Sequence, residues 1–280
     1  MARRRAPLRA LRSPEAIIGG LLLAAMVLTA VFAAGIAPFD PNEQDVARRL
    51  LPPLSMPHVL GTDHLGRDIL SRILFGTRVA LIVGTTAVLI SGTIGVALGL
   101  ISGYFGGWVD DVTAWLVNVQ LSFPFILLAI TVVAVLGGGL RNLIVVLALT
   151  GWVVYARVVR AETLALRERD FVQAARALGV HLTRILLRHI LPNALTPVIV
   201  IATFEMARMI VSEAALSFLG LGVEPALPSW GAMLADGRTY LSSAWWVATF
   251  PGLAIAFTVL GANLLGDWLH TELDPSLGEL

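Results

Sequence analysis

The sequence lacks both cysteine and lysine, so all of its 20 basic residues are arginine. Without cysteine, the chain has no disulfide framework and gives no indication of a redox compartment. Without lysine, it cannot form a phosphate-binding loop, because the lysine of the Gly-Lys-Ser/Thr element reaches the β- and γ-phosphates. If a nucleotide powers the function of this chain, a separate polypeptide must therefore hydrolyse it.

Charged residues are also scarce: they make up 14% of the 280 residues, whereas hydrophobic residues make up 57%. That composition is too apolar for a soluble domain of this length. Several stretches of about 20 apolar residues are long enough to cross a bilayer as helices. The sequence therefore predicts an all-α polytopic membrane protein in a lipid bilayer, and its net charge of +1 suggests no nucleic-acid partner.

Six apolar stretches are predicted to span the membrane, at about 16–37, 78–101, 108–136, 143–159, 194–219 and 245–265. Arginines before the first stretch predict a cytoplasmic N-terminus, and the even number of spans then places the C-terminus on the same side. A cleaved signal peptide is the alternative for the first stretch, which the length of its apolar run disfavours. The chain is thus divided into an N-terminus with the first span (1–37), an extracytoplasmic segment (38–76) and a core of five spans (77–280). In the core, the extracytoplasmic loop 220–243 is expected to form a short amphipathic element around Trp230.

Residues 167–193 are a polar stretch between apolar ones and are predicted to form two short amphipathic helices in the cytoplasm. Gly179 is expected to end the first helix, because glycine adopts positive φ without a Cβ clash. Pro192 is expected to start the next membrane span. By its stripes alone, the stretch fits a basic helix pair lying on anionic lipid. The apolar stripes consist of Phe171, Ala174, Ala175 and Leu178 in the first helix, and of Leu182, Ile185, Leu186, His189 and Ile190 in the second.

The same stretch resembles the EAA loop of the membrane subunits of bacterial ABC importers. The resemblance rests on Gln173-Ala174-Ala175, on Gly179, and on His189 shortly before Leu191-Pro192. Glutamate is usual in place of Gln173 and isoleucine in place of His189, although histidine is typical of the peptide-importer branch. The resemblance implies that a loop at 161–193 docks into a groove of a separate ATPase subunit, which holds ATP and Mg, while this chain binds no cofactor. The residues implied for this coupling are Phe171, Gln173, Ala174, Ala175, Leu178, Gly179, Arg184, His189 and Pro192.

Two further stretches, 60–72 and 214–234, resemble the C-type permease subunit of dipeptide and oligopeptide importers. They contain Gly61-Thr62-Asp63, Gly66-Arg67-Asp68 and Ser71-Arg72 in the first case, and 217–222 with Ser229-Trp230-Gly231 in the second. The resemblance implies the type I importer permease fold and a subunit of the bacterial inner membrane that forms half of a translocation pathway. The implied partners are a B-type permease subunit, two ATPase subunits and an extracytoplasmic solute-binding protein. Di- and oligopeptides are the default solutes, and nickel, glutathione or another small solute is the alternative.

Four polar residues of the fifth span, Glu205, Arg208, Ser212 and Glu213, lie within one broad face of a helix. Ionisable side chains at bilayer depth are costly unless they face a partner or water, so these residues are predicted to line the translocation pathway. The alternative is that Glu205 and Arg208, three residues apart, form a local ion pair that only orders the helix.

Histidine and aspartate residues of the external segment could be drawn as metal ligands, but their spacing matches no closed metal site. Turns and helix caps are the preferred interpretation, with Thr62 or Asp63 at the head of a short helix and a bend at Gly66. The residues concerned are His58, Asp63, His64 and Asp68.

Glycines at 95, 99 and 103 would let two helices approach closely, either within the chain or between subunits. In the third span, Trp115 and Asn118 stand where importer relatives usually have an arginine and an aspartate.

Two other classes of membrane protein fit the sequence less well. A membrane-embedded hydrolase would need a nucleophile with a base or a metal-binding motif, and no GxSxG, HExxH or intramembrane aspartate pair is present. A self-contained secondary transporter usually has inverted repeats and broken helices, and the sequence indicates neither. The chain is therefore expected to be a non-catalytic transport subunit.

Overall fold

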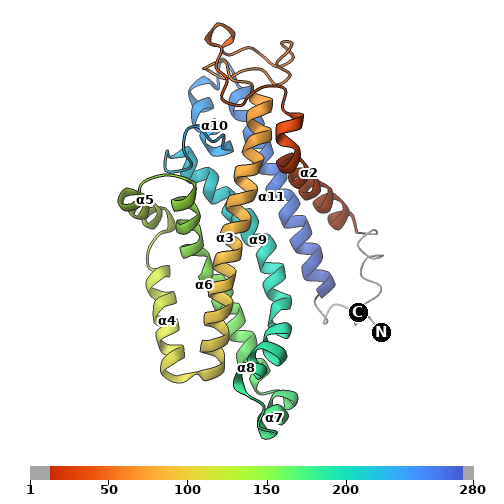
Figure 1. Cartoon of the computed structure of the whole chain (residues 1–280), viewed down its shortest axis with the longest axis vertical. Helices are drawn as coiled ribbons and strands as arrows, with labels where there is room; N and C mark the ends of the chain where they lie inside the picture. The colour runs from red at the N-terminus through yellow and green to blue at the C-terminus, as the bar shows by residue number, and fades with distance from the viewer. Residues whose placement is uncertain (1–12, 274–280) are drawn as a thin grey trace.

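The computed structural model describes residues 13–273, which form a bundle of long helices with short helices at both of its ends (Figure 1). The long helices are α2 (Pro14–Ile36), α3 (Ile69–Phe105), α4 (Gly107–Leu121), α5 (Phe125–Leu136), α6 (Leu140–Arg167), α9 (Leu191–Phe218) and α11 (Trp246–Leu273). The short ones are η2 (Val46–Arg48), α7 (Asp170–Ala177), α8 (Leu182–Arg184), η3 (Ile185–Ile190), α10 (Trp230–Gly237) and η4 (Arg238–Tyr240). In this part of the chain, β-type pairing is limited to two isolated bridges, so the predicted all-α class is confirmed.

Five helices are long and apolar enough to cross a membrane, and α4 with α5 forms a sixth candidate that is bent by 88°. The third span predicted at about 108–136 is therefore broken into two helices, and the expectation that the chain has no broken helix is wrong. Pro124 has no N–H to continue the helix, and its ring disfavours helical backbone at the preceding Phe123. As a result, α5 turns away from the axis of α4 and lies beside the N-terminal half of α6 (Figure 1).

Close packing of α3 against α6 forms one side of the bundle (Figure 1). Gly95, Gly99 and Gly103 are buried in α3. A methyl group on Gly99 would lie 2.7 Å from the carbonyl oxygen of Ala156, and one on Gly103 would lie 2.7 Å from Cβ of Thr163. The glycine face is thus a contact within this chain, because only a bare backbone lets the two helices approach so closely.

The start of α3 lies inside the segment 38–76 that was expected to be extracytoplasmic. Asp68 caps the helix by accepting a hydrogen bond from the backbone N–H of Ser71 at 2.8 Å. Thr62 and Asp63 do not head a helix, which corrects the prediction. Asp63 instead accepts the N–H of Leu65 at 2.8 Å in a turn that continues through Gly66, whose φ is +78°.

The segment 37–68 and α10 lie together at one end of the molecule, and α7 and α8 lie at the other (Figure 1). The expected short element around Trp230 is α10. It begins at Trp230, whose indole is 2% exposed and donates to the carbonyl of Ile73 at 3.1 Å. This bond joins α10 to the first turns of α3.

Candidate functional site

The end of α7 has the geometry that the sequence predicted for Gly179. The φ of this glycine is +70°. Its N–H donates to the carbonyl of Arg176 at 2.9 Å, and the N–H of Val180 donates to the carbonyl of Ala175 at 3.0 Å. These two bonds form a Schellman motif, which satisfies carbonyls that the helix end would otherwise leave without donors.

The exposed side of α7 carries most of the apolar stripe that the sequence identified. Phe171 is 45% exposed, Leu178 is 83% exposed, and Ala174 is exposed as well. The helix is attached to the protein through Val172, which is fully buried, and Ala175. The predicted stripe therefore does not coincide with the buried face, and only Ala175 belongs to both. We call Phe171, Ala174 and Leu178 the coupling surface, because the sequence predicts all three as residues that couple to an ATPase.

Two arginines of this loop form hydrogen bonds to the end of α3. Arg167 donates from Nη1 to the carbonyl of Gly103 at 2.9 Å. Arg176 donates from Nε to the hydroxyl of Tyr104 at 3.0 Å, and its guanidinium carbon lies 4.7 Å from the centre of the Tyr104 ring. These contacts hold α7 in a fixed position at the end of the bundle. The side chains of the coupling surface are therefore in place before any partner binds.

Gln173 has a hydrogen-bonding role that a glutamate could not fill. Its amide Nε2 donates to the carbonyl of Arg167 at 3.1 Å and lies 3.4 Å from a carboxylate oxygen of Glu168. A glutamate at this position would have no N–H to donate and would place a second negative charge beside Glu168.

The stretch after Gly179 is not a separate short helix, contrary to prediction. Residues 182–218 form one continuous helix, in which η3 is a π-helical turn and the N–H of Leu191 donates to the carbonyl of Leu186. Pro192 follows this turn instead of restarting the chain. Because a proline ring clashes with a helical carbonyl four residues earlier, the wider π-turn lets the helix pass through the proline without a break.

The remaining residues predicted for coupling lie along this helix. His189 is half-buried, and its carbonyl accepts the side-chain N–H of Asn193 at 2.7 Å, while Arg184 and Pro192 are exposed. From the second predicted stripe, Ile185 and Ile190 are buried against Val172 and Ala175.

Glu205 and Arg208 form an ion pair in the middle of α9. Glu205 is 6% exposed, and its carboxylate accepts from Nε and Nη2 of Arg208 at 2.9 and 2.6 Å. The Arg208 side chain is 43% exposed. The local pair is thus present, yet its cation lies on the outer side of the helix.

Glu213 and Ser212 are placed differently from this pair. Glu213 is 1% exposed and accepts the hydroxyl of Ser217 at 2.7 Å, whereas Ser212 is half-buried. The four polar residues of the fifth span therefore do not share one surface. The exposed neighbours of Arg208 on α9 are Val211 and Ala215.

The histidine and aspartate residues of the external segment form separate pairs. Nδ1 of His58 lies 3.0 Å from Asp68, which is also the cap of α3. Asp63 binds Nε of Arg67 at 2.6 Å, and His64 stacks on Tyr240 with ring centres 5.8 Å apart. Within residues 13–273, no three histidine or acidic side chains gather at a place that could hold a metal ion.

One ion pair near the α7 end of the molecule was not identified from the sequence. The Asp110 carboxylate, in the first turn of α4, accepts from the guanidinium of Arg160 on α6 and from the hydroxyl of Ser102. The two partners of Asp110 are 8 and 50 residues away in the sequence. Trp115, one of the two departures from the relatives, is 62% exposed on α4.

Two known families match the sequence. The family described as "binding-protein-dependent transport system inner membrane component" matches residues 95–279, and the "N-terminal TM domain of oligopeptide transport permease C" matches residues 3–53.

Relatives with named functions are similar over nearly their whole length. The dipeptide transport system permease protein DppC of Alkalihalophilus pseudofirmus is 42% identical, with 94% of this chain and 86% of the relative covered. The glutathione transport system permease protein GsiD of Pectobacterium atrosepticum is 43% identical, with 96% and 89% covered. The di/tripeptide transport system permease protein DppC of Pseudomonas aeruginosa is 42% identical, with 93% and 88% covered.

A solved structure shares the fold. A chain of the methionine ABC transporter MetNI in an inward-facing conformation superposes with a TM-score of 0.58 at 21% identity, covering 72% of this chain and 96% of that chain. At that identity, the similarity bears on the fold alone.

Proposed function

Because the chain belongs to the family of binding-protein-dependent transport system inner membrane components and is thus a permease subunit of an ABC importer, we propose that its α7 docks into a groove of a separate ATPase subunit. The observation that carries this proposal is the coupling surface: Leu178 is 83% exposed and Phe171 45% exposed on a helix that is otherwise fastened to the protein. The resemblance of this loop to the EAA loop of importer subunits supports the same assignment.

The exposed apolar side chains of α7 would gain free energy if a protein partner covered them. Moving a leucine or phenylalanine side chain from water into an apolar groove contributes about 1.5–3 kcal/mol. Because the helix is already fixed by the bonds of Arg167 and Arg176, little further ordering opposes the association. ATP and Mg belong to the ATPase subunits, which couple hydrolysis to the permease through this contact.

Replacement of Leu178 by aspartate tests the docking. Leu178→Asp should abolish co-purification of the ATPase subunit without changing the amount of permease in the membrane, because the charge would be buried in the groove. The matched control is Leu241→Asp, at a leucine that is 56% exposed near η4 at the opposite end of the molecule. An ATPase that co-purifies equally with both variants would overturn the proposal.

The second part of the proposal assigns the exposed side of α9 to the translocation pathway, which this chain forms together with a B-type permease subunit. A guanidinium in the middle of a membrane helix is costly in lipid, so the 43% exposed side chain of Arg208 needs water or a protein partner beside it. Glu205 lies beneath it and supplies the counter-charge within the chain. Under this proposal, Ser212 and Glu213 contribute to the same region from the interior of the bundle.

Di- and oligopeptides are the solutes we propose, with delivery by an extracytoplasmic solute-binding protein and both termini in the cytoplasm of a bacterium. The relatives are named for dipeptide, di/tripeptide and glutathione transport, so glutathione is the first alternative. Nickel or another small solute is the second, from the resemblance to the peptide-importer branch. Uptake of labelled dialanine, glutathione and Ni²⁺ by cells with and without this chain separates them. Uptake that depends on the chain for glutathione or Ni²⁺ but not for dialanine would contradict the peptide assignment.

A further inference from the structure

A cavity of about 630 Å³ opens at the extracytoplasmic end of the molecule. Its walls come from the start of α3 with the preceding turn, from α10, from the loop after α9, and from the glycines before α6. Neither the coupling surface nor the exposed side of α9 around Arg208 contributes to it.

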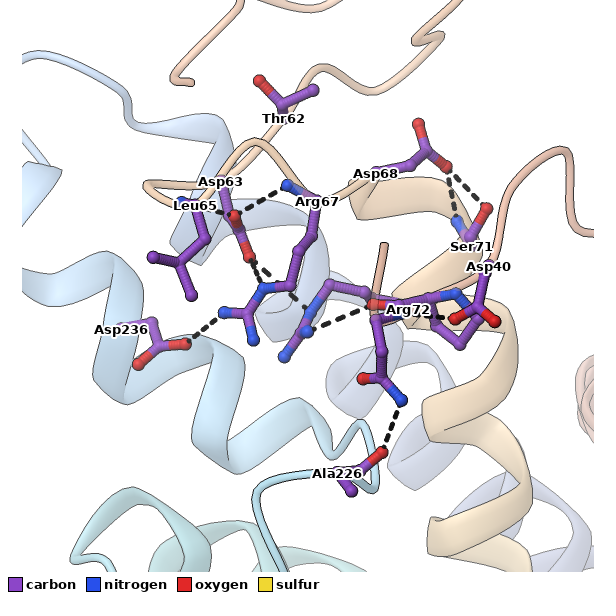
Figure 2. A network of polar contacts seen from close by, with 12 residues as sticks. Asp40, Thr62, Asp63, Leu65, Arg67, Asp68, Ser71, Arg72, Ala226 and Asp236 are labelled. Carbon is purple, nitrogen blue, oxygen red and sulfur yellow. Dashed lines mark hydrogen bonds and ion pairs between the residues drawn. The ribbon is translucent and has the colours of Figure 1, made fainter. Parts of the chain in front are cut away.

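A charged network forms one wall of this cavity (Figure 2). Figure 2 shows the guanidinium groups of Arg67 and Arg72 side by side, close to Asp63. The Asp63 carboxylate accepts from Nε of Arg67 at 2.6 Å and lies 3.8 Å from Nε of Arg72. Asp236 of α10 accepts from Nη2 of Arg67 at 3.1 Å. Two carboxylates therefore balance two guanidinium groups, and the four charges sum to zero.

The guanidinium group of Arg72 has more N–H donors than the surrounding residues have hydrogen-bond acceptors. The residue is 3% exposed, its Nη1 donates to the carbonyl of Pro41 at 3.3 Å, and its Nε has no hydrogen-bond partner. A guanidinium carries five N–H donors, and leaving buried donors without acceptors is costly. The side chain lines the cavity, so an acceptor placed there could reach it.

A second unsatisfied atom lies on the same cavity. Among the described residues, five buried side-chain polar atoms lack a partner, and two of them, Nε of Arg72 and Nδ1 of His64, belong to residues that line this space. A polar ligand in this cavity could satisfy both groups: the guanidinium needs an acceptor, and the imidazole nitrogen donates or accepts according to its tautomer.

The far wall determines the charge of that ligand. Glu224 lines the cavity and accepts only one long bond, from the N–H of Leu140 at 3.4 Å, while the side chain of Asp236 is 38% exposed. The lining residues thus include two guanidinium groups, Arg67 and Arg72, and two carboxylates, Glu224 and Asp236, so their formal charges sum to zero and do not favour a phosphate or another dianion. A molecule with one carboxylate and one ammonium group matches both walls.

We propose that this cavity binds a small zwitterion, whose carboxylate is held by Arg72 and whose ammonium group is held by Glu224 and Asp236. Guanidinium and carboxylate groups form strong charge-assisted hydrogen bonds, so Arg72 is the main donor. The inference rests on the proposed import function only in that the solute enters from this end. It does not depend on the docking of α7.

The experiment measures binding of three probes to the complete transporter complex in lipid nanodiscs, without its solute-binding protein, by ligand-observed NMR. The probes are dialanine, dialanine amide, which lacks the carboxylate, and N-acetyl-dialanine, which lacks the ammonium group. Dialanine should bind, and both analogues should bind at least about tenfold more weakly, because each loses a charge-assisted contact. This series needs no variant and is therefore independent of folding.

Variants then locate the site. Arg72→Gln and Glu224→Gln should each weaken dialanine binding by about tenfold. Arg48→Gln, at an arginine that is 54% exposed outside the cavity, should leave it unchanged. Leu178→Asp should also leave it unchanged, so a failure of the docking proposal would not be mistaken for a failure of this one.

Three results would overturn the inference: equal binding of dialanine and its amide, unchanged binding in both cavity variants, or no binding of any probe. If no probe binds and Arg72→Gln nevertheless abolishes the stimulation of ATP hydrolysis by the solute-binding protein, the carboxylate comes from that protein, and the proposed small-molecule site does not exist.

Discussion

The end of the molecule that carries α7 exposes apolar side chains, whereas the end that carries α10 buries charged ones. Leu178 and Phe171 point outward from α7, while Asp63 and Arg72 are each 3% exposed near the start of α3. An exposed apolar surface is stable in isolation and gains free energy when a partner covers it. A buried charged network is stable only while each charge keeps its partner. The first end is therefore suited to docking, and the second is sensitive to any change in its own charges.

The largest effect should come from removing a charge at the α10 end. Asp63→Ala leaves Arg67 and Arg72 with one carboxylate fewer in a buried place, and we expect a loss of about 3–5 kcal/mol in the free energy of unfolding. Urea unfolding of the purified protein in detergent measures this loss. Asp45→Ala is the control, since its side chain is 47% exposed and paired with the exposed Arg48, and it should cost less than about 1 kcal/mol. Equal free energies of unfolding of the two variants would contradict the claim that the buried charges at this end depend on their partners.

At the α7 end, the corresponding change concerns backbone conformation. Gly179→Val places a β-branched side chain at a φ of +70°, which costs about 1–2 kcal/mol or more and distorts the end of α7. We expect transport to be lost while membrane insertion stays normal. Gly20→Val is the control, because a methyl group on that glycine meets nothing within 4 Å and φ there is not positive. Normal transport by Gly179→Val would show that the shape of this turn is not needed.

Between the two ends, cysteine labelling tests the exposed side of α9. The natural chain has no cysteine, so single cysteines at 208 and 211 can be compared with cysteines at 209 and 210, which replace residues that are 1% and 0% exposed. In the assembled complex, a water-soluble thiol reagent should label the first two positions several-fold faster. Equal rates at all four positions would leave Glu205 and Arg208 as a structural ion pair only.

The smallest effect is expected for Gln173→Glu. The variant loses the bond to the carbonyl of Arg167 and adds repulsion with Glu168, and each of these exposed contacts is worth less than about 1 kcal/mol. We expect a modest decrease in solute-stimulated ATP hydrolysis, which the double variant Glu168→Gln/Gln173→Glu should partly restore. Activity of the single variant at or above the natural level would show that this hydrogen bond does not position α7.

Local sequence patterns predicted the parts of the fold whose causes are local. Apolar runs indicated the membrane helices. The helix end at Gly179 was also predicted and is confirmed. It could be predicted because a Schellman motif depends on a few adjacent residues. The break before Pro124 and the π-turn before Pro192 were missed, since proline interrupts one helix and is accommodated in another. The surroundings of each proline decide between these outcomes.

Contacts between distant residues account for what the sequence could not predict at the sites. The stripe on α7 indicated an amphipathic helix, but Val172 and only Ala175 of the stripe face the bundle, where they pack with Ile185 and Ile190. Likewise, Arg67 and Asp236 are 169 residues apart. Asp63 looked like a helix cap or a metal ligand because its partners could not be identified from spacing alone.

Site-specific cross-linking of α7 tests the central claim most directly. In the otherwise cysteine-free chain, Leu178→Cys and Ala174→Cys are on the coupling surface, while Ala175→Cys, only 6% exposed, is on the buried face of the same helix. With a short thiol-to-amine cross-linker applied to the assembled complex, the cysteines at 178 and 174 should join to the ATPase subunit and the cysteine at 175 should not. Cross-linking at 175 that equals cross-linking at 178, or none at 178 in a complex that hydrolyses ATP, would contradict the assignment of α7 as the docking element.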